Sequence, residues 1–74
     1  MKALPTLEIG ARDAPDPRMV HRVQALCTAL GAPCVIDGEF GPETQNTVRA
    51  VQQQFSLTRD GIVGPLTWLA LITD

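Results

Sequence analysis

Residues 37–44 read Asp-Gly-Glu-Phe-Gly-Pro-Glu-Thr, and residues 60–67 read Asp-Gly-Ile-Val-Gly-Pro-Leu-Thr. The second stretch lies twenty-three residues after the first and repeats its Asp, its two Gly, its Pro and its Thr in register. Five matches in eight positions are too many for coincidence in a chain of 74 residues. The chain therefore contains a duplicated unit, and the architecture is expected to be built on it.

Each copy of the repeat predicts a tight turn that starts a helix. Asp-Gly favours a turn because Asp can accept hydrogen bonds from nearby backbone, and Gly adopts a positive φ without steric cost. The second Gly suits the N-cap, and the Pro suits the first helical position, where no N–H is needed. Glu43 falls in the first turn, where its charge favours the helix dipole. Thr44 and Thr67 follow at positions from which a hydroxyl can turn back to the loop.

The spacing of apolar residues predicts an all-α fold, a compact bundle of three helices with short connections. The first helix is expected from Pro17 to Leu30, with Asp16 as its N-cap and Gly31 as the glycine that ends it. The second helix is expected over residues 42–55 and the third over residues 65–72. The side chains expected in the interior are Val20, Val23, Leu26, Cys27, Leu30, Val48, Val51, Phe55, Leu57, Trp68, Leu71 and Ile72.

Residues 1–16 show no helical period and predict an extended N-terminal arm, which leaves residues 17–74 as the helical domain. The apolar anchors of the arm are expected to be Leu4, Leu7 and Ile9. Leu7 and Ile9 would share one side if the arm runs as a strand.

Length and charge exclude several classes of function. A net charge of −2, with basic residues spread along the chain, argues against binding to nucleic acid. No apolar run is long enough to span a membrane, and the first residues lack the apolar core of a secretory signal. The localisation stays open: cell wall, periplasm or cell exterior would follow if this is a module of a secreted or phage protein.

No group of residues predicts catalysis, a metal site or a cofactor. His21 is expected at the solvated edge of the first helix, without a nucleophile and orienting acid in a plausible sequence relationship to it. Asp37 and Asp60 could be the paired carboxylates of a glycosidase, but turn formation explains both. The repeat lacks the acidic spacing of a calcium loop, and two cysteines with one histidine are too few zinc ligands. We therefore expect a non-catalytic binding module.

Four residues leave alternatives open. Cys27 and Cys34 could form a disulfide in an oxidising compartment, or Cys27 could simply fill a buried position as a small apolar residue. Trp68 could be a platform for a sugar or peptide, or a core residue. Arg49 could meet a carboxylate at the domain surface, or be solvated.

With these residues in view, the chain resembles the peptidoglycan-binding domain family, which consists of small three-helix modules attached to bacterial and phage cell-wall hydrolases. The residues that carry the resemblance agree with the family pattern in order, spacing and type. They are Val20, Val23, Gln24, Leu26, Leu30, Gly31, Asp37, Gly38, Phe40, Gly41, Thr44, Val48, Gln52, Leu57, Asp60, Gly61, Val63, Gly64, Thr67, Trp68 and Leu71, with Leu7 and Gly10 in the leader.

The chain departs from the family pattern around the second helix. Thr47 stands in place of the common Ala, and Val51 in place of the common Phe. Phe55 replaces a polar or small residue, and Ser56 replaces a Gly. These changes bear on the shape of the binding groove more than on the fold.

The resemblance implies a non-catalytic role in binding the stem peptide or glycan of peptidoglycan, so that an attached or associated hydrolase or assembly is held at the wall. The ligand is expected near the two repeat loops and helix N-termini. The alternative is a protein-interaction or assembly subunit of a phage or cell-envelope machine that keeps the fold without binding the wall. The residues expected to line or shape the ligand site are Asp37, Gly38, Phe40, Thr44, Asp60, Gly61, Thr67 and Trp68.

Overall fold

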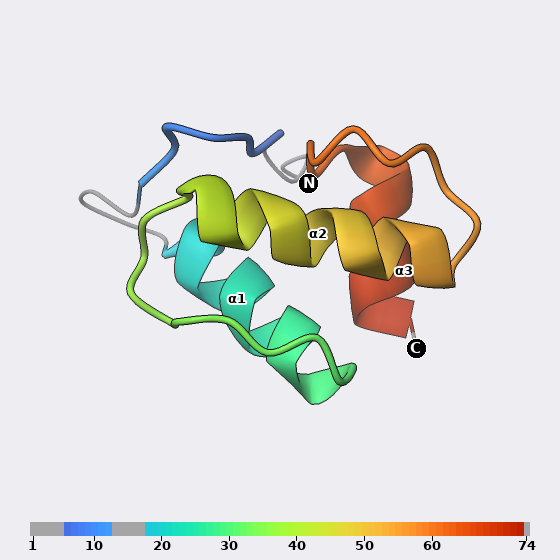
Figure 1. The fold of residues 1–74 in the computed structure, drawn as a ribbon, viewed down its shortest axis with the longest axis horizontal. Helices are drawn as coiled ribbons and strands as arrows, with labels where there is room; N and C mark the ends of the chain where they lie inside the picture. Colours follow the sequence, from blue (N-terminus) through green and yellow to red (C-terminus); the bar gives the residue numbers. More distant parts are fainter. Residues whose placement is uncertain (1–5, 13–17, 74) are drawn as a thin grey trace, which may run out of the picture.

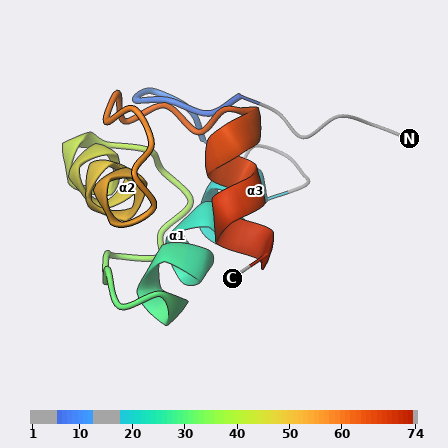
Figure 2. The same ribbon diagram turned by 90° about the vertical axis from the view of Figure 1, so that its right-hand side faces the viewer.

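The computed structural model describes residues 6–12 and 18–73. Within these ranges the chain forms three helices, α1 (Met19–Ala29), α2 (Pro42–Gln54) and α3 (Pro65–Thr73). Helix α1 packs against both other helices, and α2 runs crosswise to α3 (Figures 1 and 2). The predicted all-α bundle of three helices is confirmed.

The helices that follow the repeats begin where the sequence predicts. Helix α2 starts at Pro42 with Gly41 as an extended N-cap, and α3 starts at Pro65. The prediction for α1 is wrong by two residues, because its N-cap is Arg18 with φ 60° and ψ 41°. A right-handed helix cannot continue through a residue in this left-handed conformation. The predicted cap Asp16, like Pro17, lies outside the described residues.

Helices α1 and α2 both end in a Schellman motif, in which a residue with positive φ lets two backbone N–H groups reach back into the last turn. At the end of α1 this residue is Gly31, with φ 90°. Ser56 occupies the same place after α2, with φ 59°. The N–H of Leu57 donates to the carbonyl of Gln52 at 2.7 Å, which closes the second motif. Each helix thus ends one residue earlier than predicted.

The interior is built mainly from the side chains that the helical spacing selects. Leu26, Leu30 and Phe55 are partly buried against this core, and Leu57 is half-buried in its loop. The prediction for Ile72 is wrong: its side chain is 53% exposed, because α3 turns Trp68 and Leu71 inward. The buried apolar residues are Leu7, Val20, Val23, Cys27, Phe40, Val48, Val51, Val63, Trp68 and Leu71.

The N-terminal arm binds both repeat loops through backbone hydrogen bonds. The N–H and carbonyl of Leu7 pair with those of Val63 at 3.1 and 2.7 Å. Further along, the carbonyl of Phe40 accepts from Gly10 N–H, and its N–H donates to the Ala11 carbonyl, both at 2.8 Å. Phe40 and Val63 hold the same position in their repeats, so the arm joins the two copies.

The two predicted anchors of the arm that the structure describes behave differently. Leu7 is buried, as expected. Ile9 is 46% exposed, so its prediction as an anchor is wrong. The chain turns at Ile9 and Gly10, where Gly10 has φ 100°, and the turn breaks the alternation that a strand would have maintained. The third anchor, Leu4, lies outside the described residues.

Candidate functional site

A buried glutamine of α1 holds the first repeat loop in place. Gln24 Nε2 donates to Asp37 Oδ1 at 3.0 Å, to the Glu39 carbonyl at 3.1 Å and to Thr44 Oγ1 at 3.0 Å. Its Oε1 accepts from the N–H groups of Asp37 and Gly38 at 3.0 and 2.9 Å. One amide therefore ties both ends of the loop to α1.

Gln52 of α2 does the same for the second loop. Its Nε2 donates to Asp60 Oδ1 at 2.9 Å, to the Ile62 carbonyl at 3.0 Å and to Thr67 Oγ1 at 3.1 Å. Its Oε1 accepts from Gly61 N–H at 3.0 Å. The two copies of the repeat thus share the same glutamine-centred arrangement, with an additional bond from Asp37 N–H in the first. Gln24 and Gln52 are both fully buried.

The repeat aspartates act as turn formers, as the sequence predicts. Asp37 Oδ1 accepts from Glu39 N–H at 3.0 Å, and Asp60 Oδ1 accepts from Ile62 N–H at 2.9 Å. These backbone bonds, followed by the glutamine amides, lower the pKa of both carboxyl groups below the ordinary 3.8 because they favour the anion. Both carboxylates are exposed to solvent and negatively charged at neutral pH.

The predicted ligand residues fall into two groups. Asp37 and Asp60 are exposed at the surface of the loops. Trp68 is only 2% exposed, so its ring is a core residue and not a platform for stacking. Arg49 of α2 is exposed, consistent with the solvated alternative. The remaining predicted ligand residues are buried inside or beneath the loops: Gly38, Phe40, Thr44, Gly61 and Thr67.

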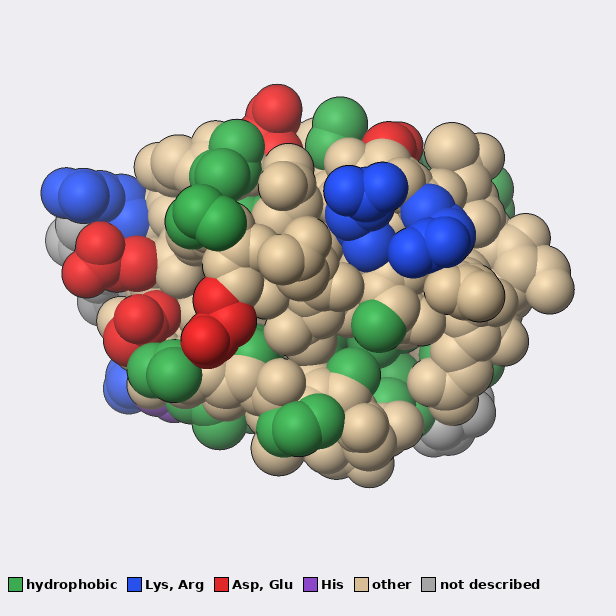
Figure 3. Space-filling view, viewed as in Figure 1, with side chains coloured by type: hydrophobic (Ala, Val, Ile, Leu, Met, Phe, Trp, Pro, Cys, Tyr) green, Lys and Arg blue, Asp and Glu red, His purple; other side chains and the backbone are tan. Residues whose placement is uncertain are grey.

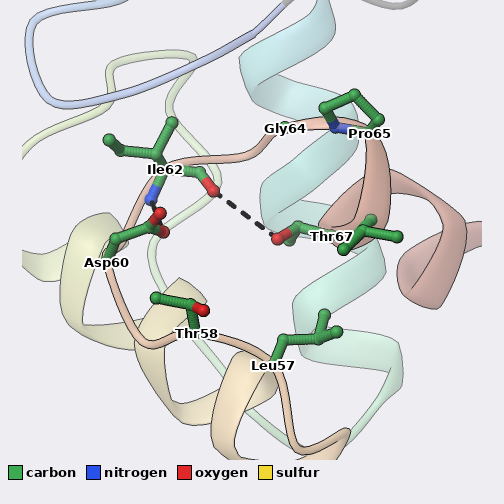
Figure 4. A pocket seen from close by; sticks show the side chains of 8 residues that line it. Leu57, Thr58, Asp60, Ile62, Gly64, Pro65 and Thr67 are labelled. Carbon is green, nitrogen blue, oxygen red and sulfur yellow. Dashed lines mark hydrogen bonds between the residues drawn. The ribbon is translucent and has the colours of Figure 1, made fainter.

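The threonines of the repeat turn back to their loops, as predicted. Thr44 Oγ1 donates to the Glu39 carbonyl, and Thr67 Oγ1 donates to the Ile62 carbonyl, each at 3.5 Å. The second of these bonds is drawn in Figure 4. Each hydroxyl also accepts a hydrogen bond from a glutamine amide. Each threonine hydroxyl therefore acts both as donor and as acceptor within the fold.

A surface groove lies beside the second repeat, between the chain that leaves α2 and the start of α3 (Figure 4). Its volume is about 220 Å³. Its lining includes the apolar side chains of Leu57, Ile62 and Leu66 and the polar side chains of Thr58 and Asp60. Leu57 and Ile62 lie on opposite sides of the groove (Figure 4). The residues that line it are Leu57, Thr58, Asp60, Ile62, Gly64, Pro65, Leu66 and Thr67.

A model of the peptidoglycan binding domain family matches residues 18–71 of this chain. The chain belongs to this family. The match spans α1, α2, both repeat loops and most of α3, which are the parts organised by Gln24 and Gln52.

The chain spans less than half the length of several known proteins that it is similar to. The zinc D-Ala-D-Ala carboxypeptidase of Streptomyces albus G is 47% identical over 38 residues, which make up 51% of this chain and 15% of that protein. The endolysin of Burkholderia phage AP3 superposes with a TM-score of 0.85 and 38% identity over 93% of this chain and 25% of the endolysin. A Clostridioides difficile peptidoglycan-binding protein, solved with glutamine hydroxamate, gives a TM-score of 0.81 and 34% identity over 90% of this chain and 40% of that one.

Both cysteines are free thiols, so the structure has the reduced form of the two alternatives left open by the sequence. Burial, reinforced by the nearby Cys34, raises the pKa of Cys27 to about 12. Cys34 is half-buried, with its Sγ 3.8 Å from the Gln24 carbonyl oxygen. In the part of the chain that the structure describes, no three His, Cys, Asp or Glu side chains gather as metal ligands.

The two glutamines that organise the site, Gln24 and Gln52, were predicted only as matches to the family pattern, without a structural role. A signal for them was present, because each Asp-Gly loop is preceded by a Val-Gln pair, Val23-Gln24 and Val51-Gln52. The Val-Gln pair is therefore duplicated together with the loop that its glutamine binds.

Proposed function

We propose that this peptidoglycan-binding domain is a non-catalytic tether that holds an attached or associated hydrolase or assembly against the cell wall. The observation that carries the proposal is the family match over residues 18–71. Similarity to short parts of a much longer endolysin and carboxypeptidase supports it. Tethering acts by raising the local concentration of the attached protein at an insoluble polymer.

The predicted ligand residues would have two different roles in this tether. Asp37 and Asp60 would face the wall, because their carboxylates are exposed. Gly38, Phe40, Thr44, Gly61, Thr67 and Trp68 would act indirectly, by fixing the shape of the two loops beneath the ligand. No nucleic-acid partner is proposed, because the net charge is −2 and the face in Figure 3 shows only a small basic patch of neighbouring side chains. No helix in the described part of the chain has the length and apolar character needed to cross a bilayer.

Sedimentation with purified murein sacculi tests the tether. The folded chain is expected in the pellet, with retention that saturates as protein is added. A small acidic protein of similar size serves as control and should stay in the supernatant. A murein turnover assay completes the test, because a tether releases no soluble products. Absence of the chain from the pellet would overturn the proposal.

A second candidate function, a protein-interaction or assembly subunit, is favoured by the exposed face of α3. Leu66, Leu69 and Ile72 are 66%, 54% and 53% exposed and lie at successive turns of one helix. Apolar side chains grouped in this way are typical of surfaces that contact other proteins. A chain that stays in the supernatant with sacculi and co-purifies with a stable protein partner would support this alternative.

A further inference from the structure

The chain has two cysteines, and the connection from α1 to the first loop brings them to the same stretch of the helix. Cys27 lies in the last turn of α1 and is fully buried, while Cys34 is half-buried in the connection. After α1 the connection turns back along the helix (Figure 1), and the Ala32 N–H donates to the Cys27 carbonyl at 2.9 Å. Cys34 Sγ then lies 3.8 Å from the carbonyl oxygen of Gln24, one turn earlier in α1.

The two thiols differ in how readily each can react. Burial, followed by the charge of Cys34, raises the pKa of Cys27 to about 12. An effect of this charge on Cys27 requires the two side chains to lie close together, because charge interactions weaken with distance. Cys34 is more open to solvent, and its pKa, raised by burial, is lowered in part by a hydrogen bond with the Thr47 side chain. Since the thiolate is the reactive form, Cys34 is the thiol that an external oxidant meets first.

A bond between these two sulfurs would act on the first repeat and not on the second. The Gln24 side chain holds the first loop by accepting from the N–H groups of Asp37 and Gly38. Cys34 contacts the backbone of the same glutamine through a thiol, which is a weak hydrogen-bond donor. A covalent bond to α1 would hold this connection more firmly. The second repeat has no cysteine in its loop or in the connection before it.

We propose that Cys27 and Cys34 form a reversible disulfide that fastens the first repeat loop to α1 in an oxidising compartment. The oxidant is a small disulfide such as oxidised glutathione. The Cys34 thiolate attacks one sulfur of this molecule, which releases one glutathione thiolate and leaves a mixed disulfide on Cys34. Cys27 then gives its proton to solvent, and its sulfur attacks Cys34 Sγ and releases the second glutathione thiolate.

The exchange balances without a further reactant. The two cysteine thiols lose two electrons and two protons, and the glutathione disulfide takes up the two electrons as it is reduced to two thiols. An excess of reduced glutathione drives the same steps backward. The switch operates whether or not the chain binds the wall.

Mass spectrometry tests the cross-link directly. The folded chain is equilibrated with mixtures of reduced and oxidised glutathione, and free thiols are then alkylated. With excess oxidised glutathione, the monomer should lose the mass of two hydrogen atoms and take up no alkylating agent. Free thiols, a stable mixed disulfide on Cys34 or a cross-linked dimer as the end product would each overturn the proposal.

Thermal unfolding tests what the bond does to the fold. Oxidation should raise the thermal midpoint of the wild type by at least about 5 °C, because a disulfide restricts the unfolded chain. Cys34→Ser is the matched control: it keeps the size of the side chain, cannot form the bond and should melt at the same temperature in both buffers. Equal midpoints for the oxidised and reduced wild type would overturn the stabilising role.

Hydrogen exchange measured by NMR tests the location of the effect. The N–H groups of Gly38 and Gly61 each donate to a buried glutamine, so the second repeat serves as an internal reference for the first. Where the loops exchange by local opening, oxidation should slow the Gly38 N–H at least threefold more than the Gly61 N–H. Equal slowing of the two would overturn the assignment to the first loop.

Discussion

Gln52 makes hydrogen bonds to both ends of the second loop from a position that is 1% exposed. Replacing it with Ala leaves Gly61 N–H and Thr67 Oγ1 without this partner, in addition to creating a cavity. Each buried polar group that loses its partner costs about 1–3 kcal/mol. We expect Gln52→Ala to lower the free energy of unfolding by at least about 2 kcal/mol in urea titrations.

The neighbouring glutamine provides the control for this prediction. Gln53 is exposed on the same helix, so Gln53→Ala should change the free energy of unfolding by less than about 0.5 kcal/mol. Gln24→Ala should resemble Gln52→Ala, because Gln24 bonds the first loop in the same way. Similar stabilities for the Gln52 and Gln53 variants would contradict the role assigned to the buried amide.

Gly61 is required for two separate reasons. Its φ is 72°, and a Cβ atom there would lie 2.6 Å from Gln45 Cγ and 3.4 Å from Arg49 Cγ. The left-handed conformation alone costs a residue with a Cβ about 1–2 kcal/mol. We expect Gly61→Ala to lower the thermal midpoint well beyond Gly41→Ala, since Gly41 has open space around it and no positive φ. Equal midpoints for the two variants would show that the loop adjusts freely.

At the scale of the element, the end of α2 can be improved. Ser56 holds a φ of 59° in the Schellman motif, where α1 uses Gly31. Glycine adopts this conformation without the steric cost of a Cβ atom. We expect Ser56→Gly to raise the free energy of unfolding by about 1 kcal/mol, measured by urea titration. The reverse change, Gly31→Ser, should lower it by a similar amount. A destabilised Ser56→Gly variant would be the contrary result.

The helix boundaries show how far local sequence signals reach. Pro42 and Pro65 start their helices as predicted, because Gly-Pro encodes both the cap and the first helical dihedral. Asp16-Pro17 looked equally good, yet α1 begins at Met19, after Arg18 in a left-handed conformation. Nothing in the residue type of Arg18 predicts a φ of 60°. Such a value is set by the surrounding fold, which a local pattern does not contain.

At the scale of the whole molecule, the free energy of unfolding should decrease at acidic pH. The pKa values of Asp37 and Asp60 are lowered in the folded state, so the unfolded chain binds protons more readily as the pH falls. The stabilisation is present above the ordinary pKa of 3.8 and is lost as the pH drops through the lower folded values. We expect the midpoint of acid-induced unfolding to lie within this acidic pH range.

A double variant isolates the two carboxylates from the other acids. Asp37→Asn with Asp60→Asn keeps the side-chain shape but removes the titration. Its stability should vary less with pH than that of the wild type between neutral pH and about pH 2. The measurement is a series of urea titrations across this range. Parallel curves for the two proteins would mean that other groups cause the acid sensitivity.

The fold was predictable largely because the repeat encodes it twice, while the site was predictable only in part. The Asp-Gly turns, the proline starts and the helical spacing of Val20, Val23, Val48 and Val51 are local signals, and the structure follows them. The groove could not be predicted in this way. It depends on how the chain leaving α2 approaches the start of α3, and this is a tertiary arrangement without a sequence pattern of its own.

The backbone pairing of residues 7–11 matters for anyone who transplants this fold onto another enzyme. A graft that starts at the first helix removes the backbone groups that hydrogen-bond to Phe40 and Val63. The N–H and carbonyl groups of Phe40 and Val63 would then lose these partners. It also uncovers the apolar surface on which Leu7 rests. A fusion partner should therefore be joined ahead of residue 6, even though the family signature itself begins at residue 18.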